Sequence, residues 1–396
     1  MAVDFSLSAE LTEITDRVRR YVHEVAIPEE SAAFDAGDRA GDDDLRRRLQ
    51  SRARDRGVFA PTLPVSWGGL GLDMRALAVV LEEAGHSVLG PLGMNAAAPD
   101  EGNMHLLAVV ADPAQQERYL QPLALGEIRS CFAMTEPAPG AGSDPSALRT
   151  TAREVPGGWR IDGRKWFITG ADGAAFTICM ARTSEQGTTA ATLFLVDTDN
   201  PGMQVVRHIP TIDDGFMGGH CEVVFDNCVV PGEAVLGEVG EGFAQAQVRL
   251  APARLTHCMR WMGIAQRAHE LSIDRAAERS AFGSRLSELG MVQSMLADSE
   301  IDLAAGRGLV MRAAWVLDEG HQGHHETSIA KAFVAEAVGR VVDRSVQIHG
   351  ALGVSTDAPL SHMYREVRPF RIYDGPSEVH RWSIARRLVR RRSTAS

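Results

Sequence analysis

The chain has 396 residues, of which 44% are hydrophobic and 23% are charged, a composition that is ordinary for a globular protein. At roughly 150 residues per domain, this length allows about two to three domains and a large core. The 41 basic and 52 acidic residues give a formal net charge of −11, which argues against a general nucleic-acid-binding protein.

The two ends of the chain carry opposite charge. The first residues include acids where a signal peptide needs basic residues followed by an apolar core. The basic tail from Ala385 to Arg392 favours a solvated terminal helix over a phosphate-binding patch. No run of about 18 apolar residues is present, so no membrane span is expected. The five cysteines are widely spaced and form no C-x-x-C pair, which predicts reduced thiols in a cytoplasmic protein.

The first region, from Leu7 to about Gly126, has the pattern of helices, and residues 1–128 are predicted to form an N-terminal helical domain. Apolar residues in its first segment recur three and four positions apart, which places them on one helix face. They are Leu11, Ile14, Val18, Tyr21 and Val25. A later helix is expected to begin at Asp112-Pro113, because proline favours the first helical position.

The middle region, from about Ser130 to Gly237, is rich in β-branched and aromatic residues, as strands are. Alternating segments flank Asp162-Gly163, which is a hairpin turn signal. The segments Ala191–Asp197 and Cys221–Pro231 have the composition of short strands. Residues 129–238 are therefore predicted to form a β-barrel-like domain inserted between helical regions.

The last region is helical again, and residues 239–396 are predicted to form a C-terminal domain built as a four-helix bundle. Its segment Met291–Leu317 is apolar on most sides, which predicts burial in a bundle core or at a subunit interface. The order of helices, strands and helices gives an α+β multi-domain protein.

The segment Cys131–Ala152 is unusually rich in small residues, which let backbone N–H groups approach a phosphate closely. A loop of this kind is weak evidence by itself. However, Thr135-Glu-Pro and Gly140-Ala-Gly-Ser-Asp144 resemble the signature T-E-P-G-A-G-S-D of the FAD-dependent acyl-CoA dehydrogenase family, with Ala138 and Pro139 as two additional residues. The resemblance implies that family's fold of helical, β and helical domains.

A second stretch, Lys165–Gly170, resembles the family segment that lies against the flavin. Phe167 falls where the family stacks an aromatic ring on the isoalloxazine, although packing in the β core is the alternative for such a strand residue. Thr169 falls where a donor faces flavin N5. The FAD ligands implied in this half of the chain are Phe132, Met134, Thr135, Gly142, Ser143, Trp166, Phe167 and Thr169.

Two motifs in the last region resemble the family's diphosphate contacts. Arg279-x-x-Phe282-Gly is similar to R-x-x-F-G, whose arginine pairs with the FAD of a neighbouring subunit, which implies a homodimer or homotetramer. Gln347-x-x-Gly350-x-x-Gly353 is similar to the turn that meets the same diphosphate. The FAD contacts implied here are Arg279, Phe282, Gln347, Gly350, Gly353, Pro376, Ser377 and Glu378. No metal site is expected.

The chain departs from the family pattern at three of these positions. Gly290 stands where the family usually has a glutamine, Ala351 replaces the second glycine of the diphosphate turn, and Pro376 replaces a threonine. Each departure concerns one FAD contact. A homologue that binds acyl-CoA without flavin is therefore one alternative function.

The resemblance implies a catalytic base in Tyr373-Asp374-Gly375-Pro376, which is similar to the family's Y-E-G-T. Some members place the base on an earlier helix, but that position is Ala253 here. Asp374 is thus the implied base, and capping of the following helix is its alternative role. A dry pocket is expected to raise its pKa. The implied substrate contacts are Ser143, Arg254 and Gly375.

The resemblance implies α,β-dehydrogenation of an acyl-CoA thioester to trans-2-enoyl-CoA, in which Asp374 takes the α-proton and flavin N5 takes the β-hydride. Electron-transfer flavoprotein is the implied acceptor, and fatty acid β-oxidation is the implied pathway. The segments Asn95–Leu107 and Asp374–His380 look like the branch with an aspartate base, whose members prefer long, branched or hydroxylated acyl chains. A flavin oxidase of the same fold, acting on acyl-CoA or on nitroalkanes, is the other alternative.

Overall fold

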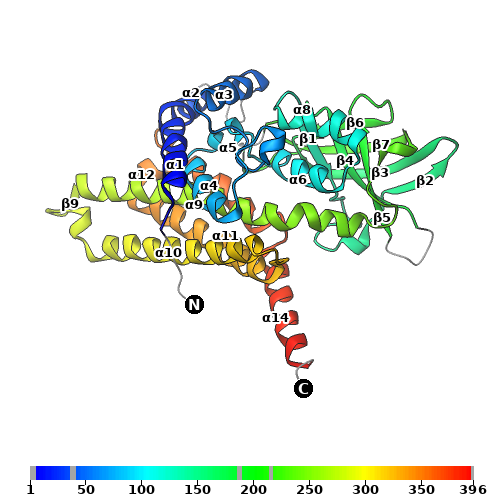
Figure 1. Cartoon of the computed structure of the whole chain (residues 1–396). Coiled ribbons are helices and arrows are strands. Elements are labelled where there is room, and N and C mark those ends of the chain that lie inside the picture. The colour runs from blue at the N-terminus through cyan, green and yellow to red at the C-terminus, as the bar shows by residue number, and fades with distance from the viewer. Residues whose placement is uncertain (1–5, 36–41, 185–189, 214–216, 394–396) are drawn as a thin grey trace.

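The computed structural model describes residues 6–35, 42–184, 190–213 and 217–393. A mixed β-sheet lies at one end of the molecule, and helices from both ends of the sequence pack together at the other end (Figure 1). Helix α9 (Gly242–Glu278) runs from the sheet into the helical part and so connects the two. The predicted order of a helical, a sheet and a helical region is confirmed.

The N-terminal helices form because their apolar residues share one face. Ile14, Val18, Tyr21 and Val25 are buried as the spacing predicted, and Asp112 forms a capping box with Gln115. The elements are α1 (Ala9–Tyr21), η1 (Val22–Ala26), α2 (Ile27–Asp35), α3 (Asp43–Asp55), η2 (Val65–Trp67), α4 (Met74–Ala84), α5 (Leu89–Gly93), α6 (Asp100–Val110), α7 (Pro113–Gln115), η3 (Gln116–Leu120) and α8 (Gln121–Ala124). The segments η1 and η3 are π-helical turns.

The middle region forms one sheet with the strand order β6-β7-β3-β2-β4-β5-β8, and β1 pairs with β4 in parallel. Its strands are β1 (Ser130–Ala133), β2 (Thr151–Val155), β3 (Gly158–Thr169), β4 (Phe176–Arg182), β5 (Ala191–Asp197), β6 (Met203–His208), β7 (His220–Pro231) and β8 (Val235–Leu236). A short 3-10 turn, η4 (Pro145–Ala147), lies between β1 and β2, and another, η5 (Gly232–Ala234), precedes β8.

The hairpin turn predicted at Asp162-Gly163 is wrong. Strand β3 continues through these residues, and the ladder with β7 shifts register between Ile161 and Gly163. The turn between β2 and β3 lies instead at Pro156-Gly157, where Gly157 adopts a φ of 86°. The Asp-Gly pair therefore marks a β-bulge here. A bulge interrupts the regular hydrogen bonds between two strands, so it can occur at the same residue pair as a turn.

The last region consists of three long helices and several shorter ones. They are α9, α10 (Gly290–Asp318), α11 (His324–His349), α12 (Ala351–Val354), α13 (Leu360–Val367) and α14 (Ser377–Ser393), with the hairpin β9 (Ser280–Ala281) and β10 (Ser284–Arg285), η6 (Leu286–Glu288) and η7 (Arg368–Arg371). Helix α14 projects from the body (Figure 1). Helix α10 buries only one face within the chain, because Met291 is 81% and Ile301 65% exposed.

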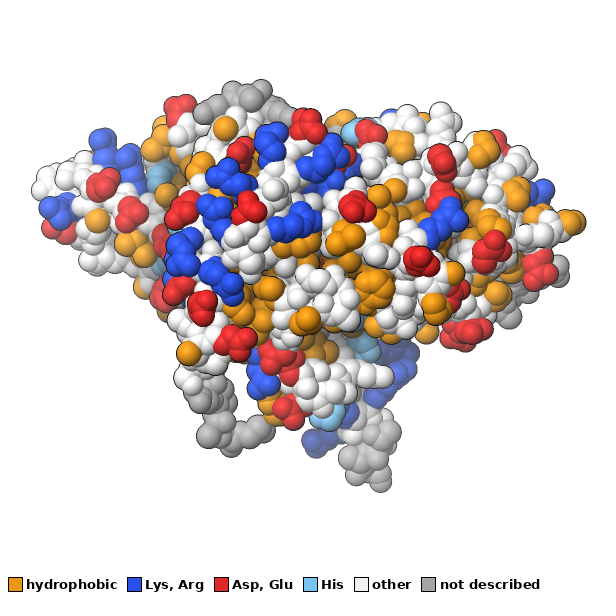
Figure 2. Space-filling view, turned by 45° about the horizontal axis from the view of Figure 1, so that its top comes forward, with side chains coloured by type: hydrophobic (Ala, Val, Ile, Leu, Met, Phe, Trp, Pro, Cys, Tyr) orange, Lys and Arg blue, Asp and Glu red, His pale blue; other side chains and the backbone are white. Residues whose placement is uncertain are grey.

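The structure also tests what the composition predicted about cysteines and membrane spans. All five cysteines are buried free thiols, as predicted. Every helix in the described ranges is too short or too polar to cross a bilayer. On the face seen in Figure 2, acidic and basic side chains of the described residues are intermixed with apolar ones.

Helices α4 and α9 touch through their backbones, which fixes the distance between the two helical regions. A Cβ atom on Gly85 would lie 2.0 Å from the carbonyl oxygen of Arg260, and one on Gly263 would lie 2.1 Å from that of Glu82. No side chain larger than hydrogen fits at either contact, so both glycines are required by this packing.

Replacing Gly263 with alanine is expected to destabilise the protein by about 1–3 kcal/mol, because the two helices must separate. The midpoint of thermal unfolding, followed by circular dichroism, measures this. Gly308 on α10 is the matched control, since no atom lies within 4 Å of the position that a methyl group would take there, and Gly308→Ala should raise the midpoint through helix propensity. Equal effects of the two substitutions would contradict the close contact.

Candidate active site

Asp374 lies in a short turn between η7 and α14 and has an unusual backbone conformation. Its φ is 54°, and the φ of Gly375 is 95°. A non-glycine residue with positive φ is uncommon and must be held by its surroundings. At Gly375 a Cβ atom would lie 2.8 Å from Nε2 of His380. The glycine is therefore needed both for the turn and for the packing of α14 against it.

Side chains from three helices bind the carbonyl oxygens of this turn. Nε of Arg254, on α9, donates to the carbonyl oxygen of Asp374 at 3.0 Å, and Nε2 of His380, on α14, lies 3.2 Å from the same atom. Nζ of Lys331, on α11, donates to the carbonyl oxygens of Phe370 at 2.7 Å and Gly375 at 2.8 Å. These contacts anchor the turn on both sides of Asp374.

Lys331 is fully buried, with 0% of its surface exposed. Burial is the main cause that lowers the pKa of Lys331, to about 8. An ammonium group in this position is satisfied by the two carbonyl oxygens and by the ring of Phe370, whose centroid lies 4.8 Å from Nζ. The lysine thus places a positive charge beneath the turn without exposing it to water.

The carboxylate of Asp374 faces His257 on α9. Nε2 of His257 lies 3.2 Å from Oδ2 of Asp374, but this oxygen has no well-aligned hydrogen bond within the described part of the chain. Burial lowers the pKa of His257 to about 3, so its imidazole is neutral near pH 7. The histidine therefore acts on Asp374 as a polar neighbour rather than as a cation.

The expectation that a dry pocket raises the pKa of Asp374 is wrong for the chain alone. Burial does raise the pKa, but the neighbouring charges outweigh it and the pKa lies below its ordinary value. The interaction with His257 contributes most to this lowering, and the charges of Arg249, Arg254 and Lys331 add to it. The turn therefore holds an ionised carboxylate at neutral pH.

A cavity extends from His257 along α9. It contains about 880 Å³ of space that no atom fills, its open mouth included. Residues three and four apart on α9 line one wall: His257, Arg260, Trp261 and Ile264. The opposite wall comes from the segments 85–100 and 129–130 and from Gly170, which directly follows β3. The cavity thus lies where the sheet meets both helical regions.

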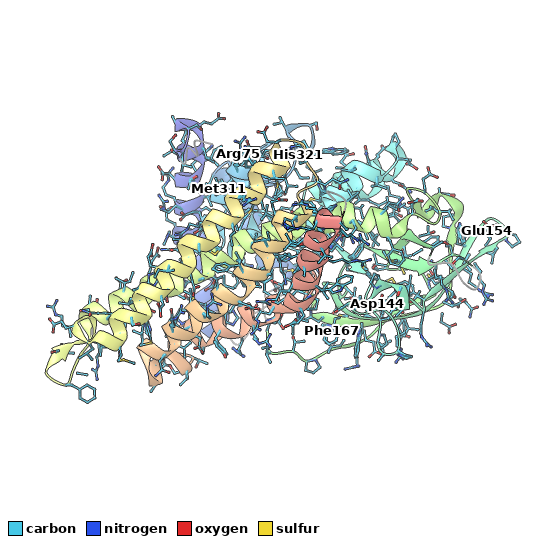
Figure 3. The ribbon with its side chains drawn as sticks, turned by 90° about the horizontal axis from the view of Figure 1, so that it is seen from below. Arg75, Asp144, Glu154, Phe167, Met311 and His321 are labelled. Carbon is cyan, nitrogen blue, oxygen red and sulfur yellow. The ribbon has the colours of Figure 1, made fainter. Side chains whose placement is uncertain are left out.

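Several predicted flavin-face residues come together at one edge of the sheet, which is formed by β1, the loop after it and the end of β3. Strand β1 carries Phe132, whose ring lies 4.3 Å from the guanidinium carbon of Arg249. The backbone N–H of Trp166 donates to the carbonyl oxygen of Thr135 at 3.0 Å, which joins β3 to the loop after β1. Figure 3 labels Phe167, which lies on β3, and Asp144, which lies in the loop after β1.

A second irregularity in β3 turns Phe167 outward. Its φ is 52°, and the register with β7 shifts between Lys165 and Ile168. The bulge leaves the Phe167 ring 44% exposed. The core packing considered as the alternative for Phe167 therefore does not occur in this chain. The side chain of Thr169, unlike that of Phe167, has a partner within the chain, because its hydroxyl is 2.9 Å from Nδ1 of His220.

A buried ion pair shapes the loop that contains Gly142 and Ser143. Nζ of Lys165 lies 2.9 Å from Oε1 of Glu136, and both side chains are buried. The Glu136 carboxylate also accepts hydrogen bonds from the backbone N–H groups of Ala141, Arg149 and Thr150. The loop folds around this carboxylate, which leaves Gly142 open on its outer side.

The remaining predicted FAD contacts lie elsewhere. The hairpin that carries Arg279 and Phe282 is at the end of the helical part farthest from the sheet (Figure 1), and Phe282 is 95% exposed. The end of α11, with Gln347, packs near this hairpin, because Ile348 contacts the cluster around Val292. Within a single chain, Arg279, Phe282 and Gln347 therefore lie far from Phe167 and Asp374. Glu378 is exposed at the start of α14.

Sequence reasoning missed His257 and Lys331. His257 follows Arg254 by three residues and so shares its helix face, which is a signal that could have been used. Lys331 carries no comparable signal, since it lies 39 and 44 residues before the two carbonyl groups that it binds.

Comparisons with known proteins agree with this architecture. Models of the acyl-CoA dehydrogenase N-terminal, middle and C-terminal domains match residues 8–127, 131–228 and 240–389. The chain is 38% identical to "Probable acyl-CoA dehydrogenase FadE2" of Mycobacterium tuberculosis over 99% of this chain and 98% of that protein. It is 36% identical to (R)-benzylsuccinyl-CoA dehydrogenase of Thauera aromatica over 98% and 97%.

A solved structure of butyryl-CoA dehydrogenase from Megasphaera elsdenii superposes with a TM-score of 0.87 at 26% identity, covering 98% of this chain and 100% of that one. The match over both whole chains means that the similarity includes the relative placement of the sheet and the two helical regions.

Replacing Lys331 with methionine is expected to raise the pKa of Asp374, because a neighbouring positive charge is lost. A depressed carboxyl pKa keeps the ionised form down to low pH, so the acid limb of the pH profile of kcat/KM should move toward neutral pH in the variant. Steady-state rates measured between pH 4 and 8 would show the shift.

Arg75→Met is the control, because Arg75 pairs with Asp318 and is not among the charges that shift the pKa of Asp374. A folded Lys331→Met variant with an unchanged acid limb would contradict the electrostatic role of the lysine.

Proposed function

The chain belongs to the acyl-CoA dehydrogenase family of FAD-dependent oxidoreductases, and from that membership we propose that Asp374 is the base that removes the α-proton of an acyl-CoA thioester. The product is a trans-2-enoyl-CoA, and β-oxidation of fatty acids is the pathway that this reaction fits. The observation that carries the proposal is the ionised carboxylate, 16% exposed, that is held in an anchored turn beside the cavity.

The residues at the sheet edge fit the flavin of FAD. An exposed aromatic ring on a bulge suits stacking against a flat ring system, and Phe167 provides one. The open side of Gly142 allows a backbone to approach a ligand closely. We propose that this edge holds FAD through Phe132, Met134, Thr135, Gly142, Ser143, Trp166, Phe167 and Thr169. When bound, FAD supplies the acceptor for the β-hydride.

Asp374 acts as the proton acceptor in this mechanism. Arg249, Arg254 and Lys331 keep it ionised before the substrate arrives. A bound acyl chain excludes water from the carboxylate, which raises the pKa of Asp374 and makes it a stronger base. The N–H group of its own backbone donates to the thioester carbonyl, where negative charge develops as the proton leaves.

An aspartate reaches roughly an ångström less far than a glutamate. The α-carbon must therefore approach the turn closely, because a base needs about 2.6–3.2 Å between heavy atoms. Nε2 of His257, 3.2 Å from Oδ2, limits the rotation of the carboxylate on one side. Arg254 holds the carbonyl oxygen of Asp374, so we assign it a positioning role in addition to the predicted contact with the substrate.

The second group of FAD contacts supports a homo-oligomer. Arg279, Phe282 and Gln347 lie far from Phe167 in one chain (Figure 1). The ring of Phe282 is almost fully exposed, so this hairpin can reach the FAD of a second copy. We assign Arg279, Phe282, Gln347, Gly350 and Gly353 to that copy's cofactor, and electron-transfer flavoprotein as the electron acceptor. Pro376, Ser377 and Glu378 remain proposed contacts at the start of α14.

The cavity favours an acyl group that carries a polar oxygen. Nη2 of Arg260 is buried and has no hydrogen-bond partner in the described part of the chain, although Nη1 donates to the carbonyl oxygen of Ala96 at 2.7 Å. Arg260 follows His257 by one helical turn on the cavity wall. Glu101 lies 3.6 Å from Arg260, and this acid disfavours a second carboxylate. A hydroxylated acyl chain satisfies both constraints.

Asp374→Asn should bind FAD as the original protein does but lose reduction of the flavin by acyl-CoA, because an amide does not accept the α-proton. Anaerobic mixing with a series of short, long, branched and hydroxylated acyl-CoAs, followed by the loss of flavin absorbance, measures this. Reduction of the variant at the original rate would place the base elsewhere.

The same experiment separates the alternative functions. Admission of air to the reduced protein should reoxidise it slowly, and rapid reoxidation with release of peroxide would identify an oxidase. A purified protein that stays colourless after incubation with FAD would identify a flavin-free homologue.

Arg260→Met should lower kcat/KM for a hydroxylated acyl-CoA by about tenfold relative to the unsubstituted chain of the same length, since a hydrogen bond to a charged group contributes about 1.5 kcal/mol or more. The ratio of the two kcat/KM values is the measurement, so that a general loss of stability affects both. An unchanged ratio would contradict recognition of the hydroxyl by Arg260.

A further inference from the structure

Two histidines and a glutamate lie close together at the end of α4, outside the proposed active site. His23 lies on the π-helical turn η1, Glu83 lies in the last turn of α4, and His86 follows the end of that helix. One potential ligand atom from each of the three side chains lies within 4.8 Å of the other two. The helices α1 and α4 that support them pack against each other.

Two polar atoms in this cluster are buried without a partner. Oε1 of Glu83 and Nδ1 of His86 have no hydrogen bond within the described residues, and the two residues are only 9% and 7% exposed. Leaving a buried polar atom unsatisfied costs about 1–3 kcal/mol. Such atoms in a folded protein call for a ligand, an ion or a water that satisfies them.

The backbone around the cluster favours a cation. Glu83 and His86 lie at the C-terminal end of α4, and the negative end of a helix dipole attracts positive charge. The π-helical turn changes the direction of side chains relative to a regular helix, and such turns occur frequently at functional sites. It places His23 so that its ring meets that of His86 edge-on, with centroids 6.1 Å apart.

We propose that His23, Glu83 and His86 form a binding site for a divalent transition-metal ion, for which Zn²⁺ is the best match. Two imidazoles and one carboxylate are a ligand set that Zn²⁺ takes in proteins, with a further position left to water. The ligand atoms need small side-chain rotations to close around an ion with bonds of about 2.0–2.2 Å. His23 is exposed and can make such a rotation.

The charges around the cluster are compatible with this assignment. Arg19 binds Oε2 of Glu83 at 3.0 Å and leaves the other oxygen for the metal. Arg267 is engaged with Glu30 at 2.7 Å and with the carbonyl oxygen of His86 at 2.9 Å.

The proposed metal site lies next to the cavity in the sequence. His86 stands between Gly85 and Ser87, and both of these residues line the cavity wall. A metal bound to His86 would tie this wall to η1 and restrict its movement. The ion would therefore stabilise the acyl-binding region without contacting the reacting atoms. This inference is independent of the proposed base.

Full-length protein without a histidine tag, freed of metal with a chelator and loaded with FAD, provides the test. Equilibrium dialysis against Zn²⁺ should give saturable binding of one ion per chain and a higher midpoint of thermal unfolding. Co²⁺ should give the visible absorption bands of a low-symmetry site with nitrogen and oxygen ligands. His23→Ala should weaken Zn²⁺ binding by at least about tenfold, since even residues behind the ligands have effects of that size.

His321→Ala is the matched control, because His321 is an exposed histidine in the connection between α10 and α11, far from the cluster in sequence (Figure 3). This variant should bind Zn²⁺ as the original protein does. Absence of saturable binding to the original protein, unchanged binding to His23→Ala, or an equal loss in His321→Ala would each overturn the proposal.

Discussion

The position of Asp374 depends on cations that bind the carbonyl oxygens of its turn. Lys331 and Arg254 reach this turn from two different long helices, and each contributes a charge as well as a hydrogen bond. A left-handed backbone at a non-glycine residue is unfavourable by about 1–3 kcal/mol, and charge-assisted hydrogen bonds are strong enough to offset it. The same cations lower the pKa of Asp374, so the geometry and the ionisation state of the carboxylate have one physical origin.

The shape of the cavity beside Asp374 depends on the contact between α4 and α9. Gly85 and Gly263 let the two backbones touch, which brings the segment after α4 against the helix that carries His257 and Arg260. The wall of the cavity is therefore set by main-chain contacts, which deform less readily than side chains. On the proposed function, an acyl chain would meet a surface that is largely formed in advance, and the polar groups on that surface would gain selectivity from its rigidity.

The sequence alone predicted the order of helical, sheet and helical regions and pointed to Asp374. Local signals account for the confirmed order of regions, because helix periodicity and strand composition are properties of neighbouring residues. The assignment of Asp374 came from a short motif and stays a prediction. The predicted turn at Asp162-Gly163 was wrong because a bulge and a turn both favour the same residue pair. The pKa of Asp374 in the chain alone could not be predicted in the same way. It depends on His257, Arg249, Arg254 and Lys331, which lie 117, 125, 120 and 43 residues before Asp374 in the sequence and meet it only in the folded chain.

If Asp374 is the base, as we propose, these contacts also explain how a carboxylate as short as that of aspartate can serve. An aspartate has one rotatable bond fewer than a glutamate, so its oxygens follow the backbone more closely. Anchoring the carbonyl oxygens on both sides of Asp374 therefore fixes the carboxylate almost as directly as a contact to the carboxylate would. It leaves Oδ2 without a well-aligned partner in the described chain, and an oxygen in that condition is available to accept a proton. The cations thus bind the backbone and lower the pKa of Asp374 without contacting Oδ2, the atom that we propose accepts the proton.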